Sequence, residues 1–340
     1  MSEKPSLIST DVDFEKDGKQ FGNMYVPQST NSAGWANYYV PIVVIRNGDG
    51  PTVVLSGGNH GDEYEGPVTL SKLARSLEAS EIQGRIIIVP MLNHPAVSSG
   101  TRLSPIDGAN MNRSFPGDPR GTITSMIADF VARFVVSLGD LVVDIHSGGS
   151  SMHMAPSVNM HNVANREQMA KMIDAGRAWS APYVFIYEDV AGAGLLPSFA
   201  ENLGKVTLGT EMGSKAQFGV DTLSITEQGV QRVLHWAGVL KDAPKLATSN
   251  VESEVVAAED PRDYIMAPCS GIFEPFFELE DDVEVGQAVG QIHSLEQIEK
   301  SPEVVTAQTS GKVIARRSIP LTTQGECVTV LVRPFSLSTN

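Results

Sequence analysis

A histidine and a glutamate three positions apart are the first residues whose types and spacing suggest metal chemistry. His60 and Glu63 belong to the stretch GGNHGDE at residues 57–63, between a predicted strand and a predicted helix. In such a turn an imidazole nitrogen and a carboxylate can reach one point, as a zinc ion requires, and glycines permit backbone conformations that other residues resist. The pair alone is a weak signal, because solvated polar pairs with this spacing are common.

His146 is the third candidate ligand, directly after the apolar run 141–145 and before Ser-Gly-Gly. The alternative is a core histidine with satisfied hydrogen bonds. Two histidines and one glutamate leave a fourth position open, which is the pattern of catalytic rather than structural zinc. Asp144 stands two residues earlier on the same face of the predicted strand, where it could orient the imidazole of His146.

Glu211 is the candidate general base, since it follows the predicted strand 205–208. A carboxylate there can take a proton from water and pass it to a leaving amine. An exposed loop glutamate is the alternative.

Two arginines, Arg102 and Arg113, lie in the irregular segment 101–117, which is rich in Pro and Gly. A guanidinium can bind a substrate carboxylate through two parallel hydrogen bonds, or stabilise an oxyanion near a metal. The chemistry suggested is therefore metal-assisted hydrolysis of a small anionic substrate.

The elements that must position these residues alternate between apolar strands and helices. This alternation predicts an α/β fold with a mostly parallel sheet flanked by helices on both faces, in which sites lie at the carboxyl ends of strands. The predicted strands are 41–46, 52–55, 84–90, 141–145 and 205–208, and the predicted helices are 66–77, 125–138 and 166–178.

The last part of the chain predicts a smaller all-β domain. Residues 241–263 have a linker-like composition, and an Ala-x-x-Ser-Gly pattern that begins at Ala267 recurs at Ala307. This segment resembles the biotinyl and lipoyl carrier domains, in which a hairpin lysine carries the cofactor. Lys300 takes that position, but Glu299 and Ser301 replace the methionines of biotin carriers, so we predict an unmodified structural domain. The predicted division is 1–245 (catalytic) and 246–340 (β domain).

Composition excludes several classes of function. The net charge is −15 over 340 residues, which argues against nucleic-acid binding. The sequence shows neither a secretory signal nor an apolar run of about 18 residues, so we expect a cytoplasmic protein that does not bind a membrane. Cys269 and Cys327 are interpreted as packing residues. A homo-oligomer is common for such enzymes.

The order of these motifs resembles the succinylglutamate desuccinylase and aspartoacylase family, which is related to the zinc carboxypeptidases. The resemblance covers roughly residues 40–240. It implies one zinc ion per chain at His60, Glu63 and His146, and catalysis by Glu211. The remaining implied roles are polarisation of the scissile carbonyl by Arg102, and binding of a polar end of the substrate by Asn112 and Arg113. The family also has a substrate-binding tyrosine, for which the candidates here are Tyr183, Tyr187 and Tyr264.

Within this family, the stretches GGNHGDEYEG and NMNRSFPG are most similar to the N-alpha-acetyl-L-2,4-diaminobutyrate deacetylases of ectoine degradation. This resemblance implies that the substrate carries a side-chain amine, which Asp107, Glu188 or Asp189 would receive. The alternatives are a deacylase of acetylaspartate or succinylglutamate, and a zinc carboxypeptidase. An alternative of another class is a metal-free binding module.

Overall fold

A long mixed sheet runs through the molecule. The structure, a computed structural model, describes residues 4–188, 194–246 and 251–337. Fifteen strands form this sheet in the order β1-β2-β3-β5-β4-β6-β10-β8-β9-β11-β19-β17-β14, and β12 and β7 pair beside this path with β19 and β17. Their bounds are β1 (Ser9–Thr10), β2 (Gly18–Thr30), β3 (Ala33–Asn47), β4 (Thr52–Gly57), β5 (Gly84–Val89), β6 (Leu141–His146), β7 (Met152–Met154), β8 (Ser157–His161), β9 (Tyr183–Tyr187), β10 (Val206–Glu211), β11 (Glu254–Ala258), β12 (Tyr264–Met266), β14 (Asp282–Val283), β17 (Gly311–Arg317) and β19 (Cys327–Pro334).

The middle of this sheet is parallel. Strand β4 lies between β5 and β6 and is parallel to both, and β6 is also parallel to β10. Every residue of β4 and β6 is buried, because helices cover both faces. This double burial explains why consecutive apolar residues, rather than alternating ones, occur in both strands, at 53–55 in β4 and 141–143 in β6.

The prediction of a mostly parallel sheet is wrong for the sheet as a whole. At one end the long hairpin β2–β3 adds antiparallel strands, and β3 is antiparallel to β5. Strand β8 is antiparallel to β10, since no helix separates it from β6 to carry the chain back across the sheet. The C-terminal strands β17 and β19 are antiparallel as well.

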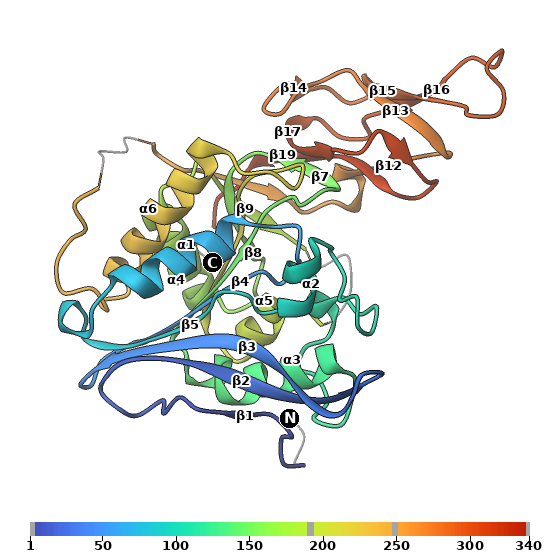
Figure 1. Ribbon diagram of the computed structural model, residues 1–340. Helices are drawn as coiled ribbons and strands as arrows, with labels where there is room; N and C mark the ends of the chain where they lie inside the picture. The colour runs from blue at the N-terminus through green and yellow to red at the C-terminus, as the bar shows by residue number, and fades with distance from the viewer. Residues whose placement is uncertain (1–3, 189–193, 247–250, 338–340) are drawn as a thin grey trace.

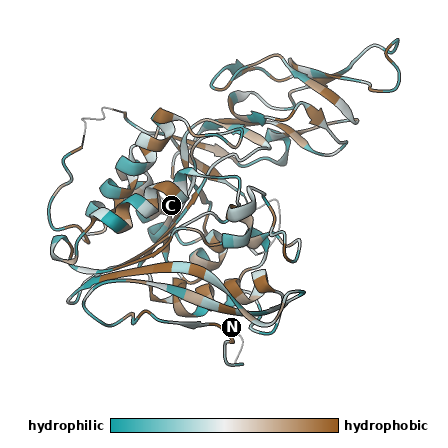
Figure 2. Ribbon diagram, viewed as in Figure 1, coloured by the Kyte–Doolittle hydropathy of each residue, from teal (hydrophilic) through white to brown (hydrophobic). Residues whose placement is uncertain are grey.

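Helices pack on both faces, as predicted. Leucines of α1, methionines of α4 and valines of α6 belong to one core cluster, and apolar residues of α3 and α5 belong to the cluster on the opposite face. Figure 2 shows hydrophobic colour along the strands and hydrophilic colour on outward turns of the helices. The helices are α1 (Glu65–Ser76), α2 (His94–Ser99), α3 (Ile123–Phe134), α4 (Arg166–Trp179), α5 (Leu196–Asn202) and α6 (Val220–Trp236).

The C-terminal strands lie at the opposite end of the molecule from the β2–β3 hairpin (Figure 1). A second, four-stranded antiparallel sheet encloses a separate core with β17 and β19. Its strands are β13 (Gly271–Pro275), β15 (Ala288–His293), β16 (Glu303–Thr306) and β18 (Leu321–Thr322). Lys300 lies in the exposed connection between β15 and β16.

Strands link the C-terminal part to the rest. Strand β11 is parallel to β9, and β7 is antiparallel to β17. Both cysteines, Cys269 and Cys327, are free thiols. Within the described ranges, no helix has the length and apolar character needed to cross a bilayer.

Candidate active site

The loop that carries the first two candidate ligands is held by close backbone packing. Strand β4 ends at Gly57, α1 begins at Glu65, and His60 and Glu63 lie between them. A Cβ on Gly61 would lie 2.0 Å from the carbonyl oxygen of Ala96, so a glycine is needed here for the loop to pass α2. The loop therefore brings both side chains to the carboxyl end of β4.

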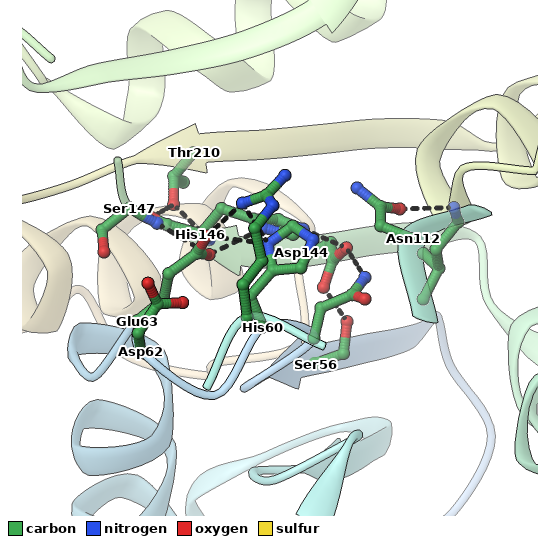
Figure 3. Close-up of polar contacts among 12 residues, drawn as sticks. Ser56, His60, Asp62, Glu63, Asn112, Asp144, His146, Ser147 and Thr210 are labelled. Atoms are coloured by element: carbon green, nitrogen blue, oxygen red, sulfur yellow. Dashed lines mark hydrogen bonds and ion pairs between the residues drawn. The ribbon is translucent and has the colours of Figure 1, made fainter. Parts of the chain in front are cut away.

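Two histidines and a glutamate meet at this edge of the sheet (Figure 3). The carboxylate of Glu63 lies 2.7 Å from Nδ1 of His60 and 2.8 Å from Nδ1 of His146. One ligand atom from each side chain lies within 4.8 Å of the others, and all three residues are buried. Among the described residues, no other group of three or more acidic, histidine or cysteine side chains could hold a metal ion.

Hydrogen bonds on the outer ring nitrogens fix the tautomer of both histidines. Nε2 of His146 lies 2.8 Å from Oδ2 of Asp144, and Nε2 of His60 lies 3.2 Å from Oδ1 of Asn110. Since these oxygens only accept, Nε2 of each ring carries a proton, which leaves Nδ1, the nitrogen beside Glu63, as the atom of each ring that a metal ion would bind. Two nitrogen donors and one carboxylate that converge in this way fit a catalytic zinc ion.

Asp144 is fully buried and well held. It accepts hydrogen bonds from the hydroxyl of Ser56 at 2.7 Å and from the amide of Asn59 at 2.9 Å. Burial opposes ionisation, but His146 and these donors outweigh it and lower the pKa of Asp144. The predicted contact between Asp144 and His146 is thus present, and it is made by an ionised carboxylate.

Charges within the cluster compensate one another. Burial disfavours ionised Glu63, but both neighbouring imidazoles outweigh it and lower the pKa of this carboxyl. Burial also disfavours the His146 cation, yet Asp144 and Glu63 hold the pKa of His146 well above its ordinary value. Without a metal, His146 therefore carries the positive charge that the carboxylates require.

Glu211 ends β10, directly opposite His146 on β6. Its Oε2 is shielded from solvent and has no hydrogen-bond partner among the residues that the structure describes. Burial, and then the charge of Glu63, raise the pKa of Glu211 to about 8. Glu211 is therefore a carboxyl that can hold a proton near neutral pH beside the candidate ligands, as a general acid and base must.

The two arginines approach the cluster from its open side. Nη1 of Arg102 lies 3.3 Å from Nδ1 of His60 and 3.5 Å from Oε1 of Glu63. Arg113 is exposed and donates to the carbonyl oxygen of Asn112 at 2.6 Å, while the buried Asn112 side chain accepts from the backbone N–H of Leu196 at 3.1 Å.

One open cavity of about 340 Å³ contains all seven predicted site residues. Its wall is formed by the ligand cluster, the Arg102–Arg113 loop, the ends of β8, β9 and β10, and strands of the C-terminal part. The seven residues are His60, Glu63, Arg102, Asn112, Arg113, His146 and Glu211. The structure brings these residues together, while their individual roles stay predictions.

The further candidates are only partly in this cavity. Tyr187, Tyr264 and Glu188 line it, whereas Tyr183 is not among its described lining residues. Asp107 is occupied elsewhere, because it accepts hydrogen bonds from the backbone and the hydroxyl of Thr124. Asp189 lies outside the described residues.

No motif in the sequence predicted the residues that form the floor of the cavity. Gly209, Asn159 and Phe185 lie there on three neighbouring strands, together with Met152 and Met154 from β7. The alternation of side chains along β10 was a usable signal, since Gly209 stands two residues before Glu211 and shares its face. The contribution of β8 depends on an antiparallel pairing that no local motif indicates.

The fold and the site together define an α/β hydrolase with a mixed sheet and a candidate metal site. Residues 49–237 match the family model of the succinylglutamate desuccinylase/aspartoacylase catalytic domain. The N-alpha-acetyl-L-2,4-diaminobutyric acid deacetylase of Halomonas elongata is 36% identical over 329 residues, which are 97% of this chain and 96% of that protein. The chain therefore belongs to this family of deacylating hydrolases.

Solved structures agree over the full length. A succinylglutamate desuccinylase/aspartoacylase from Rhodobacter sphaeroides has a TM-score of 0.92 at 37% identity, covering 97% of this chain and 100% of that one. The product-bound ectoine utilization protein EutE from Ruegeria pomeroyi has a TM-score of 0.91 at 35% identity, covering 97% and 99%. The similarity thus includes the C-terminal strands as well as the catalytic part.

Proposed function

We propose that this chain is a zinc-dependent deacetylase that hydrolyses N-alpha-acetyl-L-2,4-diaminobutyrate to acetate and L-2,4-diaminobutyrate. The observation that carries the proposal is the shared cavity, in which a buried His-Glu-His cluster, a proton-holding glutamate and two arginines meet. A metal-free binding module would not need a carboxyl with a raised pKa beside three converging metal-ligand atoms.

The residues of the chain have distinct tasks in this reaction. A zinc ion held by His60, Glu63 and His146 would supply Lewis acidity to the acyl carbonyl and acidity to a water molecule. Glu211 accepts the proton of the water as its oxygen adds to the acyl carbon, and then returns the proton to the amide nitrogen as the C–N bond breaks. The guanidinium of Arg102 donates hydrogen bonds to the oxyanion of the tetrahedral intermediate.

The choice of substrate rests on the relative from Halomonas elongata, which is named for its action on N-alpha-acetyl-L-2,4-diaminobutyric acid. Arg113 and Asn112 lie at the cavity wall, where a guanidinium and an amide can bind the α-carboxylate of an amino acid. Acetylaspartate and succinylglutamate are the alternative substrates, and a peptide is the third.

The test is acetate release from a panel of substrates by the zinc-loaded protein. We expect turnover of N-alpha-acetyl-L-2,4-diaminobutyrate to exceed that of acetylaspartate, succinylglutamate and dipeptides by orders of magnitude. If another member of the panel is turned over faster, that compound replaces N-alpha-acetyl-L-2,4-diaminobutyrate as the assigned substrate. If no member is turned over, the proposed deacylase activity is refuted.

Glu211→Gln tests the catalytic assignment, because glutamine keeps the size of the side chain and cannot transfer the proton. We expect near-normal zinc content and loss of turnover by about 10²-fold or more. Glu227→Gln is the matched control, since Glu227 pairs with Lys72 outside the cavity. Wild-type turnover by Glu211→Gln would remove Glu211 from its role.

Two further proposals concern the division of the chain and Lys300. We propose a catalytic part (1–245) and a β domain (246–340) in which Lys300 is unmodified. An intact mass equal to that of the bare chain tests the second point, since an added biotin or lipoyl mass would contradict it.

A further inference from the structure

One polar side chain in the cavity floor has an unsatisfied atom in the folded chain. Asn159 on β8 is 9% exposed, and its Oδ1 is shielded from solvent without a hydrogen-bond partner in the described part of the chain. The residue nevertheless lines the cavity. Leaving a buried polar group unpaired costs about 1–3 kcal/mol, so such a group calls for a reason beyond folding.

Strand register places Asn159 next to the catalytic residues. Asn159 pairs directly with Gly209 on β10, which in turn pairs with Asp144 on β6. Two residues further along β10, Glu211 pairs with His146. Because directly paired residues project from the same face and side chains repeat every second residue, Asn159 lies on the face of Glu211, one row deeper in the sheet.

Gly209 leaves the room that the Asn159 side chain occupies. A Cβ at Gly209 would lie 2.2 Å from Oδ1 of Asn159. The carboxamide therefore lies across the backbone of β10, at the floor of the cavity, and any larger residue at 209 would displace it.

Apolar side chains share the cavity lining with this carboxamide. Phe185 pairs directly with Asn159 on β9, and Met154 and Ala315, which pair with each other, line the same cavity. A single hydrogen-bonding group in an apolar pocket fixes which end of a ligand is accepted there. The floor thus has the composition of a specificity pocket.

We propose that Asn159 recognises the end of the substrate side chain, and that it selects a short side chain that ends in an amine. This inference rests on the proposed function. If the ligand cluster and Arg102 hold the acyl group, and Arg113 holds the α-carboxylate, the third substituent of the substrate Cα is left to enter the floor. The amine then donates to Oδ1 of Asn159, which satisfies the unpaired acceptor.

Glu188 is the competing residue for this task. It lines the same cavity and carries a negative charge, but it is exposed and accepts a hydrogen bond from Asn162 at 3.3 Å. Water competes for an exposed carboxylate, so its contribution to selection is smaller than that of a buried, unpaired amide.

The experiment compares two substrates that differ only at the side-chain end. N-alpha-acetyl-L-2,4-diaminobutyrate ends in an amine, and N-alpha-acetyl-L-norvaline has a methyl group at that place. We expect the wild type to prefer the first in kcat/KM by at least about 10²-fold, and Asn159→Leu to reduce this ratio by at least about tenfold. Asn159→Asp keeps the shape of the side chain and should raise the ratio, because a charged acceptor binds the amine more strongly than a neutral one.

Zinc content and circular dichroism show whether each variant is folded and loaded, and Asn159→Asp remains informative if the leucine variant does not fold. Calorimetry measures the affinities for free L-2,4-diaminobutyrate and free L-norvaline, and their ratio tests the same preference without turnover. A protein that binds the first better but hydrolyses neither acetyl compound would refute the proposed function and retain this inference. An unchanged preference in both Asn159 variants, or its loss in Glu188→Gln instead, would overturn the inference.

Discussion

The titration of Glu211 gives a prediction that needs no substrate. In the metal-free chain, burial and the charge of Glu63 raise the pKa of Glu211 to about 8, against 4.5 for an unperturbed glutamate. Between these values the unfolded chain releases a proton that the folded chain keeps, so the free energy of unfolding falls as pH rises. Below about 4.5 both states are protonated, and above about 8 both are ionised, so the loss is complete there.

The pKa difference corresponds to at most about 5 kcal/mol. Glu211 lines an open cavity, and solvent reduces this value, so we expect about 2–5 kcal/mol. Glu211→Gln lacks the titration. At about 2 °C per kcal/mol, and with about three quarters of the titration between pH 5 and pH 8, the Tm of the wild type should therefore fall relative to that of the variant by about 3–7 °C over this range.

The assay is thermal unfolding of both proteins after chelation and removal of metal, at half-unit steps of pH. Only the difference between the two Tm values is interpreted, since the other titrating groups are shared. A difference that stays constant within about 1 °C would show that Glu211 has an ordinary pKa, and would refute the reasoning that makes it a proton carrier.

Three further predictions concern the metal site and its loop. Zinc binding at pH 7 should release between about one and two protons, because His146 and Glu211 both hold a proton in the metal-free chain, and calorimetry in buffers of different ionisation enthalpy measures the release. Asp144→Asn should weaken zinc affinity by about 10–100-fold, as judged by chelator competition, since the Nε2 proton of His146 loses its charged acceptor. Gly61→Ala should lower the Tm by about 2–6 °C, because its Cβ meets the carbonyl of Ala96, whereas Gly34→Ala, which meets nothing within 4 Å, should change it by about 1 °C or less.

The ligand loop could be predicted because its signals are local. His60 and Glu63 stand three residues apart between a strand and a helix, and His146 ends an apolar run, so the sequence itself places all three at the same sheet edge. The helices that cover the sheet were also predicted, since their apolar spacing is carried by consecutive turns.

The antiparallel strands could not be predicted in the same way. Strand β8 is buried throughout, like the parallel strands, although only Val158 and Met160 of its five residues are apolar, and its direction depends on the short connection from β6. The hairpin β2–β3 pairs over thirteen residues of β2, yet its exposed half has no apolar alternation that would reveal it. The direction of β8 is decided by a non-local pairing with β10, whereas the hairpin β2–β3 is a local pairing that its sequence pattern does not indicate.

The register of β10 and β8 determines which residues of this site can be substituted independently. Because side chains alternate along β10, Glu211 and Gly209 lie on the same face of the sheet. A shift of one residue in the pairing of β10 would turn both away from the cavity. Asn159, by contrast, belongs to the neighbouring strand β8 and is not one of the three metal-ligand candidates. Substitution at Asn159 can therefore change which side chain is accepted while the row that contains His146 and Glu211 keeps its geometry. Catalysis and selection thus share one face of the sheet but occupy separate rows.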